Sequence, residues 1–371
     1  MKPISFPFDF NHKLIVLSVV INGKKTLRVV LDTGMPGDGL LLFKTRKTEE
    51  LDLSFSNRLI AGGDSLKTVP VQLADDVVID FPGLRLPKQS ILVVDGNPFP
   101  VQTDIDGIVG YALLHRFAVK LDFDKCLMRC WLSKEYKCEN QFVELPLVFR
   151  EGFPYFPCSV STSNGDQLSI FAYLDLGAAS TIALNSDTHD EFKFTDEAIE
   201  SKISSALGGT VFGRVNRIET LDIAGFPLKN VIATSCGGEL ARCIGQDGVH
   251  EASIGTDVLR RFKVVIDYSN KRLFLTPGSS FHEPFRFSMS GLTVRKMKLG
   301  HFLIEHVTPN SPGSESGLQK GDIIVRVNGI QANKVTIEEM NQILGKEDSL
   351  VVIISRKHTL MKFIINPRAM L

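Results

Sequence analysis

The feature that most constrains the fold of this chain is an internal repeat, which occupies its first 277 residues. Matched residues near the end of each copy lie 145 positions apart, and they are Gly110 and Gly255, Phe117 and Phe262, and Asp122 and Asp267. Further upstream, residues 30–34 (Val-Leu-Asp-Thr-Gly) correspond to residues 173–177 (Tyr-Leu-Asp-Leu-Gly), displaced by 143 positions. Two copies in one order and at a near-constant displacement predict a duplicated domain of about 140 residues.

Each copy has the sequence pattern of a β domain. In the first copy, Asn22-Gly23 stands between apolar runs at residues 14–21 and 27–31. This pattern predicts a β-hairpin, because a type I′ turn needs positive φ at both central residues. A single short helix is expected in each copy, at residues 112–116 and 257–261. Short strands, glycine turns and little helix predict a mainly β fold with two homologous β-barrel lobes.

The repeat also duplicates a carboxylate. Asp32 and Asp175 each end an apolar strand, and a glycine follows two residues later. One such triplet is weak evidence, because Asp and Gly are common turn residues. Two carboxylates related by duplication are more informative, since a pair about 3 Å apart shares one proton and supplies both a base and an acid. The sequence therefore predicts a catalytic pair that activates water for attack on an amide carbonyl.

These motifs resemble those of a known family. Residues 30–34 resemble the active-site motif of pepsin and retropepsin aspartic peptidases, and residues 106–110 (Asp-Gly-Ile-Val-Gly) resemble their downstream apolar-apolar-Gly element. The repeated ending Arg-Phe-x-Val-x-(Leu/Ile)-Asp-(Phe/Tyr) is similar to bacterial two-lobed members. The resemblance covers about residues 4–277. It implies peptidase lobes at 1–138 and 139–280, and an endopeptidase that binds a polypeptide in the interlobe cleft.

The resemblance also assigns roles around the aspartates. It implies that the hairpins at residues 60–67 and 207–214 are flaps over the substrate, although neither contains a tyrosine. Their glycine pairs are Gly62 and Gly63, and Gly208 and Gly209. It makes Thr33, Gly34, Leu176 and Gly177 the active-site loop residues that accompany the two aspartates.

Leu176 departs from the family pattern. The family has Thr or Ser after the second aspartate, where the hydroxyl bonds to the opposite lobe, and a buried partner left unpaired costs about 1–3 kcal/mol. The residues after the glycines, Met35-Pro36 and Ala178-Ala179, also lack hydroxyls. Two alternatives therefore stay open: an active aspartic endopeptidase, or a weak or inactive homologue that acts as a peptide-binding protein.

A different domain is predicted at residues 281–371. Residues 311–324 (Ser-Pro-Gly-Ser-Glu-Ser-Gly-Leu-Gln-Lys-Gly-Asp-Ile-Ile) resemble the PDZ domains of bacterial peptidases. Such domains bind a peptide C-terminus or segment as an added strand. The resemblance places the carboxylate-binding loop around Met289, Ser290 and Gly291, and the predicted peptide-binding residues are Ser290, Gly291 and Leu292. Two other roles stay open, namely a rigid packing module and a scaffold in which the PDZ domain is the working part.

Composition argues against several other functions. Lys plus Arg and Asp plus Glu number 42 each, so charge gives no support for nucleic-acid binding. The six cysteines contain no CxxC pair and no zinc-ligand spacing, so neither a metal nor another cofactor is expected. Cys236 and Cys243 are either bridged across a turn or, as we favour, free thiols. Because the two lobes are fused, we expect a monomer.

The N-terminal residues carry no secretion signal as written. Residues 1–11 lack an apolar core and a small-residue cleavage site. The apolar run at residues 14–21 is far too short to span a bilayer, so no transmembrane segment is expected. The localisation predicted from the sequence as written is cytoplasmic, and it becomes periplasmic or secreted if a leader has been removed.

Overall fold

The computed structural model describes the chain at residues 3–11, 13–35, 37–61, 68–95, 104–162, 167–194, 198–206, 209–237, 250–297 and 299–371. Two compact units are present. The N-terminal unit comprises Met1–Lys193, Ile203–Val211 and Arg217–Pro284, and the C-terminal unit comprises Phe194–Lys202, Phe212–Asn216 and Phe285–Leu371. The domain boundaries expected after residues 138 and 280 remain predictions.

The first repeat forms an eight-stranded sheet. Its strands, in spatial order, are β2 (Asp9–Asn11), β3 (Leu14–Ile21), β4 (Lys25–Leu31), β9 (Gly107–Val109), β5 (Leu40–Phe43), β8 (Leu84–Val94), β7 (Thr68–Phe81) and β6 (Ser56–Ala61). The predicted hairpin joins β3 to β4, and Asn22 and Gly23 at its turn have φ of 48° and 67°. Strand β3 also pairs with β7, so the sheet curls into a nearly closed ring.

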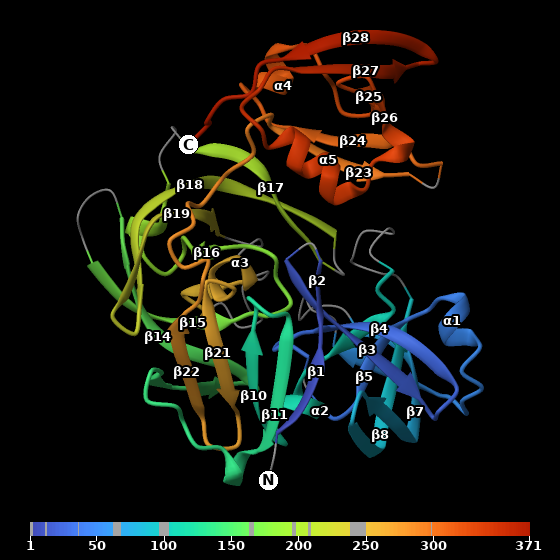
Figure 1. Cartoon of the computed structure of the whole chain (residues 1–371), viewed down its shortest axis with the longest axis vertical. Helices are drawn as coiled ribbons and strands as arrows, with labels where there is room; N and C mark the ends of the chain where they lie inside the picture. The colour runs from blue at the N-terminus through green and yellow to red at the C-terminus, as the bar shows by residue number, and fades with distance from the viewer. Residues whose placement is uncertain are drawn as a thin grey trace. The chain divides into compact units, whose positions relative to one another are not determined.

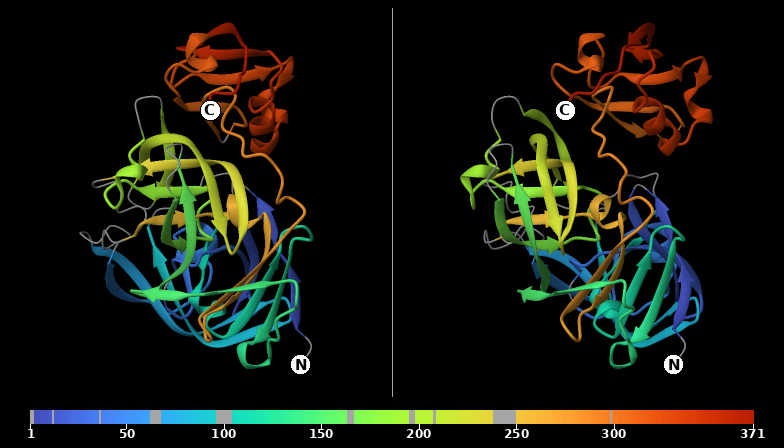
Figure 2. Two further views of the ribbon diagram at one scale, coloured as in Figure 1. Left: turned by 90° about the vertical axis from the view of Figure 1, so that its left-hand side faces the viewer. Right: turned by 60° about the vertical axis from the view of Figure 1, so that its left-hand side comes forward.

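The second repeat forms a sheet with the same order of equivalent strands. They are β13 (Val148–Arg150), β14 (Phe153–Ser161), β15 (Gln167–Leu174), β20 (Ala252–Ile254), β16 (Ile182–Asn185), β19 (Phe226–Cys236), β18 (Gly209–Ile223) and β17 (Ile199–Ala206). The extra pairing of β14 with β18 repeats that of β3 with β7. Two similar β lobes are therefore confirmed, and strands dominate every view (Figures 1 and 2).

A third sheet joins the two repeats. Its strands, in order, are β1 (Ile4–Pro7), β11 (Leu127–Leu132), β10 (Phe117–Asp122), β21 (Phe262–Asp267), β22 (Arg272–Pro277) and β12 (Val143–Pro146). At its centre, the repeated Phe-x-Val-x-(Leu/Ile)-Asp strands β10 and β21 pair with each other, antiparallel, with Val119 opposite Ile266. All six residues of β10 are buried. The matched sequence endings therefore form the pseudo-twofold junction of the lobes.

Helices are short in the N-terminal unit. The two predicted helices occur as α2 (Tyr111–Leu114) and α3 (Thr256–Leu259), each directly after the matched glycine of its copy. Among the described residues of this unit, the other helical segments are α1 (Arg46–Glu49) and the 3₁₀ turns η2 (Ser133–Glu135) and η3 (Asp190–Phe192). No helix in the described part of the chain is both long and apolar enough to cross a membrane.

The C-terminal unit has its own sheet and core. Its strands are β23 (Leu292–Lys296), β24 (Phe302–Val307), β25 (Ile323–Val327), β27 (Leu350–Arg356) and β28 (Thr359–Ile365) in spatial order, with β26 (Ile330–Gln331) beside β25. Its helical segments are α4 (Pro312–Glu315), η5 (Ala332–Lys334) and α5 (Ile337–Leu344). Helix α5 begins with a capping box between Thr336 and Glu339, and its buried Met340 joins the core around Phe302 and Ile324.

Candidate active site

The two candidate catalytic residues lie on equivalent loops. Asp32 directly follows β4, and its backbone N–H donates to the carbonyl of Val109 in β9 over 2.8 Å. Asp175 directly follows β15, and its N–H donates in the same way to Ile254 in β20 over 3.0 Å. Each carboxylate is therefore placed by a parallel pair of strands whose members lie far apart in the sequence.

The predicted apolar-apolar-Gly element packs against the first loop. A Cβ on Gly110 would overlap the carbonyl oxygen of Asp32 and lie 2.8 Å from that of Met35. The N–H of Tyr111 donates to the same Met35 carbonyl over 3.1 Å. The element thus supports the loop through backbone contacts that leave no room for a side chain at Gly110.

Backbone N–H groups orient both carboxylates. The Gly34 N–H donates to Oδ1 of Asp32 over 2.7 Å, and the Gly177 N–H donates to Oδ1 of Asp175 over 3.0 Å. The loops also meet each other, because a Cβ on Gly177 would lie only 2.5 Å from Cγ of Asp32. The Asp32 carboxylate therefore packs directly on the loop of the opposite lobe.

Thr33 makes the hydrogen bonds between the loops. Its buried hydroxyl donates to the carbonyl of Leu174 and accepts from the N–H of Leu176 over 3.0 Å. Leu176 is fully buried and has no hydroxyl to return equivalent bonds to the first loop. The structure thus brings together all six predicted loop residues. The side-chain hydrogen bonds between the two loops come from Thr33 in the first lobe, and Leu176 in the second lobe adds none.

The pKa values of both dyad carboxyls are raised. Burial raises the pKa of Asp175 to about 7, with a further contribution from the negative charge of Asp32, while hydrogen bonds from Ser253 and the loop backbone lower it. Burial also raises the pKa of Asp32, and the Gly34 N–H lowers it. Interacting carboxylates titrate as a pair, so these shifts keep a proton on the dyad toward neutral pH.

Two residues near the dyad escape sequence reasoning. Ser253 in β20 donates from Oγ to Oδ2 of Asp175 over 3.3 Å. Tyr173 in β15 is buried, and the nearby charges of Asp175 and Asp32 add to the effect of burial in raising its pKa. A signal for both exists in the repeat, because they are polar where the first copy has the aliphatic residues Val30 and Ile108.

The predicted flaps are described only in part. Strands β6 and β7 pair from Ser56 opposite Leu73 to Ala61 opposite Thr68, as expected for the sides of a hairpin. The glycines Gly62, Gly63 and Gly208 lie outside the described residues, and Gly209 is the first residue of β18. Cys243 also lies outside them, so both alternatives for Cys236 and Cys243, the favoured free thiols and a bridge across a turn, stay untested. The flap role of both hairpins likewise stays a prediction.

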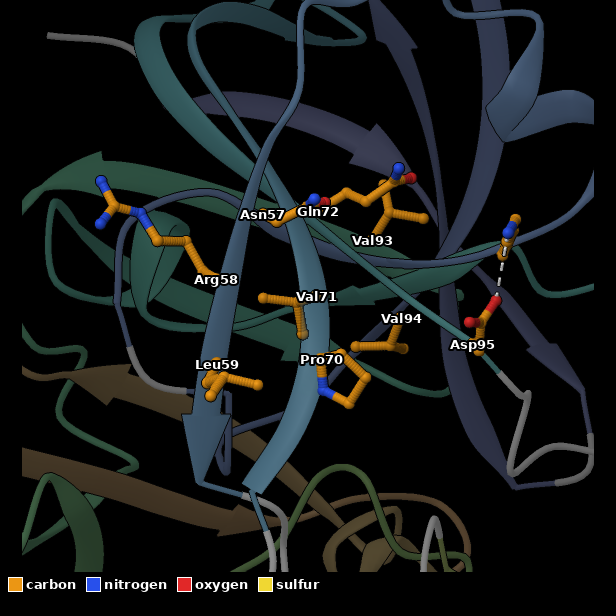
Figure 3. Close-up of a pocket in the computed structure, with 10 residues that line it drawn as sticks. Asn57, Arg58, Leu59, Pro70, Val71, Gln72, Val93, Val94 and Asp95 are labelled. Carbon is orange, nitrogen blue, oxygen red and sulfur yellow. Dashed lines mark ion pairs between the residues drawn. The ribbon is translucent and has the colours of Figure 1, made fainter.

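A cavity of about 720 Å³ lies beside strands β6, β7 and β8 of the first lobe (Figure 3). Its lining residues are Lys44, Asn57, Arg58, Leu59, Pro70, Val71, Gln72, Val93, Val94 and Asp95. The Nζ of Lys44 lies 3.5 Å from Oδ1 of Asp95. None of the loop residues around the dyad lines this cavity, so it is separate from the candidate active site.

The residues predicted for the PDZ peptide-binding loop, Ser290, Gly291 and Leu292, lie at the start of strand β23, and their binding role stays a prediction. Ser290 is fully buried, and its carbonyl accepts from the N–H of Gly313 over 2.8 Å. Gly291 has a φ of +72°, and a Cβ there would overlap Ser311, so only glycine fits this position. Leu292 begins β23, which pairs only with β24 among the described strands. The loop therefore leads into an edge strand.

Comparisons with known proteins agree with this architecture. Residues 303–357 match the model of the PDZ domain family. The crystal structure of the aspartic proteinase from Irpex lacteus matches the chain with a TM-score of 0.52 and 14% sequence identity, over 76% of this chain and 99% of that one. No curated protein matches the chain. The chain therefore combines the fold of a pepsin-like aspartic proteinase, with two β lobes, and a PDZ domain near its C-terminus.

The described part of the chain holds no group of three or more His, Cys, Asp or Glu side chains arranged to bind a metal ion. The polar groups around the dyad are instead carboxylates, hydroxyls and backbone N–H groups. Such a set can hold a water molecule and share a proton, which is the chemistry that amide hydrolysis by paired carboxylates needs.

Proposed function

We propose that the chain is an aspartic endopeptidase in which Asp32 and Asp175 activate the attacking water. The observation that carries the proposal is the contact of two equivalent Asp loops, with Thr33 bonded to both Leu174 and Leu176 across the lobes. The pKa of Asp175, raised to about 7, supports it, because one member of a catalytic pair must keep its proton.

The reaction follows from a pair that shares one proton. The ionised carboxylate accepts a proton from water as the water oxygen bonds to the peptide carbonyl carbon, and the protonated carboxylate donates to the carbonyl oxygen. The tetrahedral intermediate then collapses, the C–N bond breaks, and the departing nitrogen takes up a proton. Every proton is exchanged among water, substrate and the two carboxylates, so the step requires no further cofactor.

The PDZ domain supports a polypeptide substrate. Domains of this family bind peptides by adding a strand to an open sheet edge. Here β23 offers such an edge, directly after the Gly291 turn. We infer that the domain binds a peptide C-terminus or segment and thereby recruits or gates substrates. Gly291→Val should abolish the binding of peptides by the PDZ domain, measured by fluorescence anisotropy with an unbiased set of labelled peptides.

Leu176 favours a second candidate function, which is peptide binding without efficient turnover. The family hydroxyl is missing at this position, so the two loops share hydrogen bonds from Thr33 but not from an equivalent residue in the second lobe. Looser positioning of the dyad would lower the rate, because small displacements of catalytic groups are costly. In this case the interlobe cleft would act as a peptide receptor.

Cleavage of an unbiased peptide mixture from about pH 3 to 8 separates the two functions, since this range covers the titration of a carboxylate pair. The wild type should cleave, whereas Asp32→Asn and Asp175→Asn should each lose activity. The exposed Asp190→Asn is the matched control and should cleave like the wild type. If the wild type binds peptides but cuts none, the endopeptidase proposal is wrong and the receptor function takes its place.

A further inference from the structure

The two lobes differ at one pair of positions beside the dyad. Tyr173 in β15 is the register partner of Ser253 in β20, and their counterparts in the first lobe are Val30 in β4 and Ile108 in β9. Partners in parallel strands face the same side of a sheet, as does the residue two positions further along the strand. Asp175 therefore has two hydroxyl-bearing neighbours, whereas Asp32 has two aliphatic ones.

The Tyr173 hydroxyl reaches the loop of the opposite lobe. A Cβ on Gly34 would lie 2.5 Å from this hydroxyl oxygen, and a Cβ on the equivalent Gly177 would lie 2.5 Å from Cγ of Asp32. The hydroxyl thus contacts Gly34 as the Asp32 carboxylate contacts Gly177. A hydrogen-bonding interaction with Thr33 lowers the pKa of Tyr173 against the larger effect of burial.

The Tyr173 ring is held in place by its own lobe. It makes an edge-to-face contact with Phe153 at 5.7 Å between centroids, and it lies 5.9 Å from the ring of Tyr155. A ring packed in this way cannot easily move its hydroxyl, because buried side chains occupy close-packed rotamer positions. The hydroxyl is therefore a rigid contact from the second lobe to the first.

We propose that Tyr173 and Ser253 are positioning residues of the dyad, which supply from the second lobe the hydroxyl groups that Leu176 and its loop lack. Tyr173 holds the Thr33-Gly34 loop across the lobes, and Ser253 orients the Asp175 carboxylate. This inference rests on the proposed function for its effect on catalysis. The residues themselves contact catalytic groups and need not touch substrate.

Removal of each hydroxyl tests the proposal in a peptide-cleavage assay. Tyr173→Phe should lower kcat by on the order of 10- to 100-fold with little change in KM, because a misplaced loop affects the chemical step more than binding. Tyr155→Phe is the matched control, since it removes a buried tyrosine hydroxyl that bonds to His250 in the same lobe. Adding Leu176→Thr to Tyr173→Phe should restore part of kcat.

Ser253→Ala should shift the pH dependence of peptide cleavage to higher pH. The Ser253 hydroxyl lowers the pKa of Asp175, so its loss should raise that pKa further and shift the basic limb of the profile to higher pH. Among the described residues, the titratable groups that interact with Asp175 or Asp32 include Tyr173 and Tyr268, and the variant leaves both tyrosines and Asp32 in place. Ser235→Ala, which removes a buried hydroxyl bonded to Phe192 in the same lobe, is the control and should leave the profile unchanged.

Thermal unfolding provides a test that needs no turnover. Tyr173→Phe and Thr33→Val should lower Tm non-additively, because both remove parts of one cross-lobe contact. The pH range over which Tm falls, as the Asp175 carboxyl ionises, should move to higher pH in Ser253→Ala but not in Ser235→Ala. Additive Tm changes, or a Tyr173→Phe variant with the kcat of Tyr155→Phe, would overturn the role of Tyr173. A Ser253→Ala variant with the wild-type pH dependence of Tm would overturn the role of Ser253.

The two proposals fail in different ways. A wild type that cleaves nothing, yet shows the non-additive Tm changes and the shifted titration, would reject the endopeptidase and retain the positioning residues. Cleavage that depends on both aspartates but is indifferent to Tyr173→Phe and Ser253→Ala would retain the endopeptidase and reject the positioning residues.

Discussion

The dyad should leave a signature in the stability of the protein, through Asp175. Its pKa is raised from a reference value of 3.8 to about 7 by burial and by the charge of Asp32. Below about pH 4 the carboxyl is protonated in both the folded and the unfolded chain, so it contributes nothing to pH dependence. As the pH rises from about 4 to 7, the unfolded chain loses this proton while the folded chain keeps it, so stability falls.

The size of this effect follows from the shift. Each pKa unit corresponds to about 1.4 kcal/mol, so three units give about 4 kcal/mol, and screening of the half-buried carboxylate by water reduces this to about 2–4 kcal/mol. Asp175→Asn removes the ionisation and should raise the free energy of unfolding at pH 8 by about that amount. At pH 3 the variant and the wild type should be nearly equal.

The assay is urea unfolding at a series of pH values, followed by far-UV circular dichroism. Asp190→Asn is the matched control, because it makes the same acid-to-amide change at an exposed ion pair with Lys193 and should keep the wild-type pH dependence. If Asp175→Asn has the wild-type pH dependence, or is less stable than the wild type at pH 8, then the pKa of Asp175 is not raised in the folded protein.

Substitutions at three further positions test close packing and charge pairing. Gly110→Ala should destabilise the N-terminal unit by about 3 kcal/mol or more in thermal unfolding, because the new Cβ would overlap the carbonyl of Asp32, and a wild-type Tm would contradict this packing. Gly177→Ala should lower cleavage by about 100-fold, because its Cβ would displace the Asp32 carboxylate, whereas near-wild-type kcat would show that the loops do not touch. Arg356→Ala should destabilise the C-terminal unit by about 3–5 kcal/mol, because it leaves the buried Asp322 carboxylate without its bidentate partner at 2.7 Å, and Arg356→Lys should recover part of that loss in the same urea titration.

The sequence determined the architecture of this protein because it contains two copies of the same domain. The displacement of about 143 positions predicted two like lobes, and Asn22-Gly23 predicted a hairpin that the structure contains. Local signals also account for the start of helix α5, where Thr336 and Glu339 form a capping box three residues apart in the sequence. These features depend on residues close together in the chain, or on a pattern that duplication preserves.

Only the tertiary structure decided how the dyad is supported. Ser253 lies 78 residues from Asp175, and Tyr173 lies well over 100 residues from Gly34, so no local pattern connects them. They meet because β15 and β20 are neighbours in one sheet and because the two lobes close against each other. The repeat marked both positions as polar substitutions for aliphatic residues. Their proximity to the carboxylates, however, depends on strand register and side-chain direction, which the folded sheet fixes.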